Sequence, residues 1–228
     1  MRGVTMGSWA WRVQPVYLLV ELLVAAGASA PHSLRDDTIS ALGMSTCAGG
    51  HSGSVVEVCS PWHVGMNVAF VVFGLLRAAG AVLLGTVLGG RPWARAAVLT
   101  WVVSGAASAA VGLVPVDRSP GWHVVVATMV FVLQPVAVLL TAEALRRGHR
   151  APRAVVGLGV VVGVLTLVAA AAFAVRLGSP TWVGGLERVA LWPAYPWLAV
   201  VGVVVAADAA GVGRVAPGPS SSETVTSS

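Results

Sequence analysis

The sequence contains no lysine, and charged residues of every kind make up only 10% of its 228 residues. An average soluble domain has about 25% charged residues, which it needs to cover a hydrophobic core with a polar surface. Hydrophobic residues reach 57% in this chain. The shortage of charge therefore excludes an ordinary soluble domain and indicates a protein that lies in a lipid bilayer.

The sequence also lacks a basic patch with interleaved aromatic residues, which is typical of nucleic-acid binding. Its 14 basic residues are all arginines, and most of them stand at the ends of hydrophobic stretches. Arginines in such positions belong to the cytoplasmic loops that orient a membrane protein. We therefore expect membrane lipids as partners and no nucleic acid.

No stretch alternates between polar and apolar residues as a barrel strand does, so helices are expected to cross the membrane. A transmembrane helix needs about 20 apolar residues, and six stretches reach this length. The sequence thus predicts an all-α, polytopic integral membrane protein with six transmembrane helices. The stretches are residues 13–30, 63–89, 96–114, 123–143, 154–175 and 186–206.

The arginines also predict the orientation of these helices. With the N-terminus in the cytoplasm, nine arginines fall on the cytoplasmic side and four on the outer side, while Arg77 lies inside the second stretch. This excess predicts that the N-terminus and the C-terminus are both cytoplasmic. Residues 1–207 would form the transmembrane domain, and residues 208–228, which are rich in Pro, Gly, Ser and Thr, a disordered cytoplasmic tail.

The first hydrophobic stretch has a second interpretation as a cleaved signal peptide. The residues "ASA" at 28–30 have the small-residue pattern of a signal cleavage site, and cleavage would leave five spans. However, the apolar stretch is longer than the usual region of about 7–15 residues, and it contains Glu21. We therefore expect residues 1–30 to be retained.

The chain has only two cysteines, Cys47 and Cys59, and both fall in the predicted outer loop 31–62. An outward-facing loop meets an oxidising compartment, so we expect a Cys47–Cys59 disulfide. Closing a loop of this size would stabilise the fold by about 3 kcal/mol. Zinc binding is the weaker interpretation, because the two thiols lack the close spacing of a zinc site.

Two charged residues fall deep inside predicted helices. Glu21 and Arg77 lie at similar depths from the cytoplasmic ends of the first and second stretches. An isolated charge at that depth costs at least about 2.5 kcal/mol, so we expect the two side chains to form an intramembrane ion pair. The alternative, a proton or ion relay, would need more titratable groups along the same helices.

Polar residues gather near the predicted outer ends of four helices. The connection "GLVPVDRSPGWH" at 112–123 carries several of them between two apolar stretches. In a compact bundle these groups would face one another across one outward-opening mouth, where they are candidates for ligand binding. The candidates are His63, Asn67, Asp117, His123, Glu187 and Arg188.

Four segments resemble the domain of unknown function 998 family of prokaryotic membrane proteins. They are "DTISALGMSTC" (37–47), "CSPWHVGMNVAFVVFGLL" (59–76), "VGLVPVDRSPGWH" (111–123) and "GLERV" (185–189). The resemblance covers nearly all of the chain before the tail. It implies six transmembrane helices and a first helix that is kept, but it supplies no activity. The Ala, Val and Gly bias and the absence of lysine suggest a bacterial cell membrane.

Several functions stay open from the sequence. The polar cluster could be a structural network. It could instead bind a small ligand or lipid headgroup, with Arg118 and Arg188 holding a phosphate or carboxylate, and a small-molecule transporter is one form of this alternative. An enzyme is a further alternative, in which His63, His123 and Glu187 would process a lipid or hold a metal. No cofactor is predicted, although His63 and His123 could together hold haem or zinc.

Overall fold

The computed structural model describes residues 2–29, 31–45, 60–88 and 92–212, and within these ranges all regular structure is helical. Cys47 and Cys59, with their predicted disulfide, lie outside the described residues, as does the tail beyond residue 212. The elements are α1 (Arg2–Arg12), α2 (Val16–Ala26), the 3-10 helix η1 (Ser40–Gly43), α3 (His63–Leu88), α4 (Pro92–Leu113), α5 (Pro120–Gly148), α6 (Arg153–Arg176), α7 (Val183–Leu191) and α8 (Ala194–Val212).

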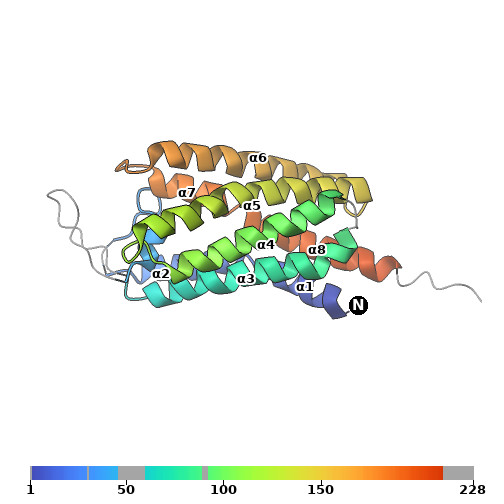
Figure 1. Ribbon diagram of the computed structural model, residues 1–228, viewed down its shortest axis with the longest axis horizontal. Coiled ribbons are helices and arrows are strands. Elements are labelled where there is room, and N and C mark those ends of the chain that lie inside the picture. The colour runs from blue at the N-terminus through green and yellow to red at the C-terminus, as the bar shows by residue number, and fades with distance from the viewer. Residues whose placement is uncertain (1, 30, 46–59, 89–91, 213–228) are drawn as a thin grey trace, which may run out of the picture.

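The helices lie side by side along the long axis of the molecule (Figure 1). The four long helices α3 to α6 each pack against the next one in the chain, and α1 packs between α3 and α8. Five segments are long and apolar enough to cross a membrane: these four helices and the segment Val183–Gly211, which contains α7 and most of α8. The chain is therefore a polytopic protein of the membrane type, and its described part is all helical.

The first expected span differs from the structure at its start. Within residues 13–30 the helix is α2, Val16–Ala26, and a separate helix, α1, precedes it along the bundle (Figure 1). Pro15 causes the break, because it has no N–H to continue the helical hydrogen bonds. Gln14 satisfies backbone groups there, since its Nε2 donates to the carbonyls of Ala10 at 3.2 Å and of Phe73 on α3 at 3.3 Å.

The last expected span is also two helices, α7 and α8, with the break at Trp192 and Pro193. The break ends the regular hydrogen bonding of α7, and the Leu191 carbonyl accepts a hydrogen bond from Gln134 Nε2 on α5 at 3.0 Å. The predicted span over 186–206 therefore lies within one apolar segment long enough to cross a membrane, but that segment is two helices rather than one. A buried glutamine compensates for the broken backbone in the interior of the bundle.

The last helix extends past the expected end of the domain at residue 207. The α8 helix continues to Val212, and Asp208 accepts a hydrogen bond of 2.9 Å from Arg150, which lies in the α5–α6 connection. Residues 208–212 are thus helical rather than part of the predicted disordered tail.

Small residues bring α3 and α4 close together. A Cβ added at Gly74 would lie 2.6 Å from the Gly105 carbonyl oxygen, and one at Gly105 would lie 2.4 Å from that of Gly74. Gly80 makes room in the same way for the indole ring of Trp11 on α1. Glycines thus allow the close helix contacts that drive association in lipid, where apolar area alone gives little preference.

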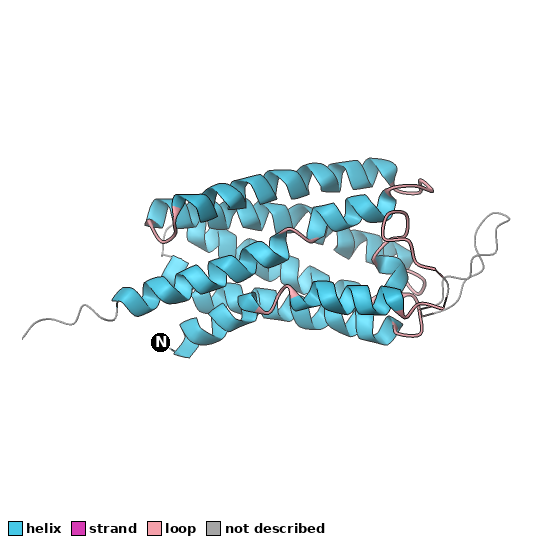
Figure 2. Ribbon diagram, turned by 180° about the vertical axis from the view of Figure 1, so that it is seen from behind, coloured by secondary structure: helices cyan, strands magenta, loops and turns pink. Residues whose placement is uncertain are grey.

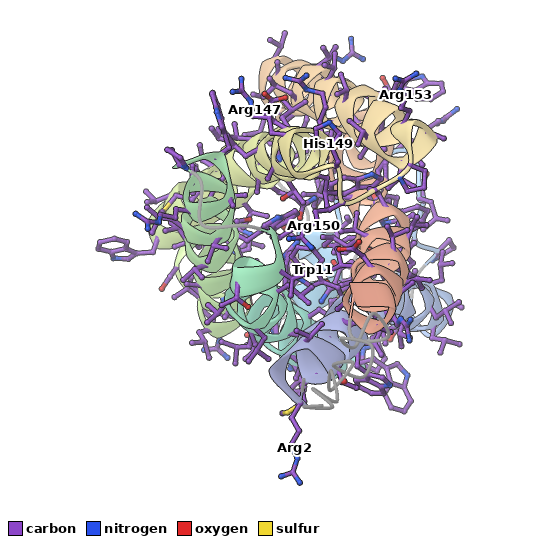
Figure 3. All side chains as sticks on the ribbon, turned by 90° about the vertical axis from the view of Figure 1, so that its right-hand side faces the viewer. Arg2, Trp11, Arg147, His149, Arg150 and Arg153 are labelled. Atoms are coloured by element: carbon purple, nitrogen blue, oxygen red, sulfur yellow. The ribbon has the colours of Figure 1, made fainter. Side chains whose placement is uncertain are left out.

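The two ends of the bundle differ in character (Figure 2). One end, called here the arginine-rich end, holds Arg2, Arg147, Arg150 and Arg153, and Figure 3 views the molecule from this side. The other, called the loop end, holds residues 31–45 and the connections α4–α5 and α6–α7. The polar residues singled out in the sequence lie mainly at the loop end.

Candidate functional site

A short stretch of chain at the loop end, residues 33–45, is called here the cover segment. It contains η1, and the side chains of Ile39 and Leu42 point into the core with 0% exposure. These two apolar side chains anchor the segment to the bundle, and polar side chains from several helices bind its backbone.

Helix α7 supplies two of these polar side chains. The Nη1 of Arg188 donates to the carbonyl oxygens of Leu34 at 2.7 Å and Asp37 at 2.8 Å. The Oε2 of Glu187 accepts the N–H of Ile39 at 2.6 Å. The backbones also approach closely, because a Cβ on Gly184 would lie 2.1 Å from the Asp37 oxygen. Glu187 and Arg188 thus fix the cover segment on α7.

Two further candidate residues hold the second half of the cover segment. Asn67 on α3 donates from Nδ2 to the carbonyl of Gly43 at 2.8 Å. Asp117, in the α4–α5 connection, accepts hydrogen bonds from the backbone N–H of Ser45 at 2.9 Å and from its hydroxyl at 2.8 Å. Arg118 donates to the same hydroxyl at 2.7 Å. These residues therefore join the segment to α3 and to the α4–α5 connection.

Glu21 forms its buried ion pair with a partner that the sequence did not suggest. Its Oε1 lies 2.9 Å from Nε of Arg188, its Oε2 accepts the indole N–H of Trp192 at 2.9 Å, and the two charged side chains are 0% and 5% exposed. The predicted Glu21–Arg77 pair is corrected by this finding. The sequence placed Arg188 near the outer end of a predicted helix, whereas α7 begins at Val183 and holds Arg188 buried inside the bundle.

Arg77 is buried on α3 among other partners. Its guanidinium donates to the side-chain oxygen of Gln134 and lies over the ring of Tyr195, 5.5 Å from the centroid. A neutral amide and an aromatic face thus solvate this charge. The same Gln134 binds the broken end of α7, so one polar side chain serves both groups.

The two candidate histidines have separate partners. His63 uses Nδ1 to contact the carbonyl of Ser60 at 2.9 Å, at the start of its own helix. His123, at the start of α5, contacts the Val114 carbonyl through Nδ1 at 2.8 Å and the Ser40 hydroxyl through Nε2 at 3.0 Å. Among the described contacts, none joins the two rings.

Ser40 is a residue that the sequence analysis missed. Its hydroxyl lies between His123 Nε2 at 3.0 Å and Glu187 Oε1 at 3.5 Å, so it connects α5 to α7 through η1. Serine is common in loops and carries no motif here. The one available signal was its place inside the stretch 37–47 that resembles the family.

A cavity of about 370 Å³ opens beside these groups, between α5, α6 and the cover segment. Its polar lining includes Ser40, His123, Glu187 and Asp117. Its apolar lining includes Phe131 and Phe173, whose rings stack with their centroids 4.8 Å apart. A smaller cavity of about 30 Å³ shares Ser40 and Glu187 with it and is also lined by Phe70 and Tyr195. Asp117, His123 and Glu187 thus line one cavity, whereas His63, Asn67 and Arg188 are not among its described lining residues.

Two titratable side chains, His32 just before the cover segment and Asp36 within it, have pKa values that their surroundings lower. Hydrogen bonds from Arg35, and then from the Trp182 N–H at 2.9 Å, lower the pKa of Asp36 to about 2. Burial, and then the charge of Arg188, lower the pKa of His32, whose Nε2 lies 3.2 Å from Nη2 of that arginine. His32 is therefore a neutral acceptor for an arginine N–H.

We expect the protein to lose stability as the pH falls below about 6.5, the ordinary histidine value. The unfolded chain takes up a proton on His32 at that pH, whereas the folded chain, with its lowered pKa, does so only at lower pH. The loss of stability develops between the pKa of His32 in the unfolded chain and its lower pKa in the folded chain, and it levels off at lower pH. Thermal unfolding of detergent-purified protein between about pH 7.5 and about pH 5 measures it. His32→Gln, which keeps an acceptor without titrating, should weaken the dependence, and an unchanged slope would refute the assignment.

Comparison with known proteins identifies the family of this chain. The family model described as "Protein of unknown function (DUF998)" matches residues 14–204. The chain belongs to this family. No curated protein and no solved structure matches the chain.

The part of the chain matched by the DUF998 family contains nearly every group described above. It includes Glu21, the cover segment, His123 and the Glu187–Arg188 pair, while α1 lies before it. The family carries no assigned activity in its description, so the function must be argued from the cavity itself.

Proposed function

We propose that this DUF998 protein binds a single-chain amphiphile with an uncharged polar head, such as a monoacylglycerol, in the loop-end cavity. The observation that carries the proposal is the division of one cavity into a polar end and an apolar wall. Ser40, His123 and Glu187 can hydrogen-bond a head, while Phe131 and Phe173 can pack against an acyl chain. A volume of about 370 Å³ is within the range of about 300–1,000 Å³ that is usual for small-ligand sites.

The charges around the cavity support an uncharged head over a phosphate or carboxylate. Its described lining includes the carboxyl groups of Asp117 and Glu187 and no arginine. Arg188, which the sequence analysis considered as an anion ligand, already donates to Glu21, Leu34 and Asp37. An anionic head would thus meet acidic groups without an arginine to bind it, whereas hydroxyl groups can donate to one carboxylate and accept from Ser40.

The proposal includes the membrane setting. Helices α1 and α2 together would form a sixth span beside the five apolar segments, with both termini in the cytoplasm of a bacterial cell and the loop end outside. The arginine-rich end supports this orientation, since arginines favour the cytoplasmic side. The cavity would then lie at the outer leaflet, where an amphiphile can enter between α5 and α6 with its head toward the water.

A tryptophan at position 127 should block the site. Ala127 lines both cavities, so the indole of Ala127→Trp would occupy the space proposed for the acyl chain. Overpacking costs about 1–3 kcal/mol, which corresponds to a fall of about fivefold to 150-fold in affinity. Native mass spectrometry of the purified protein with added monooleoylglycerol measures the bound fraction.

The matched control is Ala171→Trp, an alanine on the exposed face of α6 outside the cavity lining. This variant should bind monooleoylglycerol as the wild type does.

A second lipid tests the charge of the head. Oleoyl lysophosphatidylglycerol, which has the same chain and an anionic head, should bind more weakly than monooleoylglycerol. Equal binding by both tryptophan variants, or a preference for the anionic lipid, would refute the proposal.

A further inference from the structure

We infer that the cavity also cleaves an ester, with the Ser40 hydroxyl as nucleophile and His123 as its general base. This inference rests on the proposed function, because the ester would be that of the bound monoacylglycerol. It adds a reaction and two catalytic residues to a binding site. The observation behind it is the contact of 3.0 Å between Ser40 Oγ and His123 Nε2 within a ligand-sized cavity.

The hydrogen bonds around His123 define which ring nitrogen is the base. Its Nδ1 lies 2.8 Å from the carbonyl oxygen of Val114, which can only accept, so Nδ1 carries the proton. In the neutral ring Nε2 is then an acceptor for the Ser40 hydroxyl at 3.0 Å, and it is closer to that hydroxyl than Glu187 Oε1, the other acceptor of the same proton, at 3.5 Å. Serine nucleophiles are activated by this arrangement, in which a third group orients the base. Here the orienting group is a backbone carbonyl.

The backbone around Ser40 is held firmly, as a nucleophile requires. The preceding residue, Ile39, is fully buried, and its N–H donates to Glu187 at 2.6 Å. Leu42, two residues after Ser40, is also fully buried, and the Asn67 side chain donates to the Gly43 carbonyl. Glu187 and Asn67 thus act as positioning residues, while Ser40 itself stays partly exposed in the cavity lining.

The reaction balances with groups that are present and water. Ser40 Oγ forms a bond to the ester carbonyl carbon while His123 Nε2 takes the hydroxyl proton. The ester C–O bond then breaks, glycerol leaves with that proton, and an acyl-serine remains. Water, deprotonated by the same histidine, then forms a bond to the acyl carbon. The bond from that carbon to Ser40 Oγ breaks, the histidine returns the proton to Oγ, and the fatty acid leaves. Thr38 lines the same cavity, and because its hydroxyl oxygen accepts the Ala41 N–H at 3.2 Å, it can donate its own proton toward the developing oxyanion.

An alkyl fluorophosphonate tests the inference, because an activated serine displaces its fluoride and forms a stable adduct. We expect the purified wild type to be labelled, with the adduct on the peptide that contains Ser40. His123→Gln should lower the labelling rate by about a hundredfold or more, since a general base contributes about 10²–10⁴. Ser40→Ala should abolish both labelling and release of oleate from monooleoylglycerol.

The matched control is Ser119→Ala, a serine at the same end of the molecule whose side chain makes no capping hydrogen bond at α5. It should label as the wild type does. Mapping the adduct in the wild type needs no variant to fold, and an adduct elsewhere, or none, overturns the inference. If monooleoylglycerol binds and is blocked by Ala127→Trp while no label or oleate appears, the binding proposal stands and the reaction fails. If the lipid does not bind, both fail.

Discussion

Arg188→Met is expected to lower the free energy of unfolding by about 3–5 kcal/mol, because it leaves the Glu21 carboxylate buried without its cation. It also removes the donors to the carbonyls of Leu34 and Asp37, so the cover segment loses its attachment to α7. Unfolding of the detergent-purified protein in mixed micelles measures the change. Loss of the segment's anchor should also weaken monooleoylglycerol binding.

The exposed ion pair at the arginine-rich end is the control for this prediction. Glu143 accepts hydrogen bonds from Arg146 and Arg147, whose side chains are 59% and 44% exposed. Glu143→Gln should cost at most about 1 kcal/mol, as surface pairs do. The double variant Glu21→Leu with Arg188→Met should recover part of the loss, because it leaves no unpaired charge. A cost of Arg188→Met no larger than that of Glu143→Gln would contradict the buried pair.

Trp11→Ala is expected to cost about 3–5 kcal/mol, the usual range for removing a buried aromatic ring. Trp11 is 0% exposed, its ring lies 6.2 Å from that of Trp101, and its indole N–H donates to the Arg77 carbonyl at 3.1 Å. Truncation would leave a cavity against Gly80, which has no side chain to fill it. The same unfolding assay measures this change.

Trp9 provides a matched comparison on the same helix. It lies two residues earlier in α1 and is 62% exposed. Trp9→Ala should change the free energy of unfolding by within about 0.5 kcal/mol, since it creates no cavity. If the two substitutions had equal effects, α1 would not pack between α3 and α8 as the structure describes.

The long helices could be predicted well because hydropathy is a property of each local stretch. The stretches 63–89 and 154–175 correspond to α3 over His63–Leu88 and α6 over Arg153–Arg176. The interrupted spans could not be predicted from hydropathy, since Pro15 and Pro193 stand inside apolar sequence. Pro135 lies inside α5 without ending it, so a proline alone does not decide where a membrane helix breaks.

The candidate site was only partly accessible to sequence reasoning. The distribution of polar residues indicated that Asp117, His123 and Glu187 belong to one end of the bundle, and all three line the loop-end cavity. The sequence predicted Arg77 as the partner of Glu21 from its similar depth, and the structure pairs Glu21 with Arg188 instead. That choice depends on how each helix is rotated about its axis, which the apolar sequence around it does not specify.

By itself the sequence determined that this chain is helical and belongs in a membrane, because too few charges and too many long apolar stretches leave no other environment for it. Only the tertiary structure decided that Arg188 meets Glu21 and that Ser40 meets His123. Those contacts join residues 167 and 83 positions apart, and they depend on the close packing of small residues and on the path of the cover segment. Composition determines whether a chain is more stable in water or in a membrane, whereas the contacts between particular side chains depend on the relative positions of whole helices.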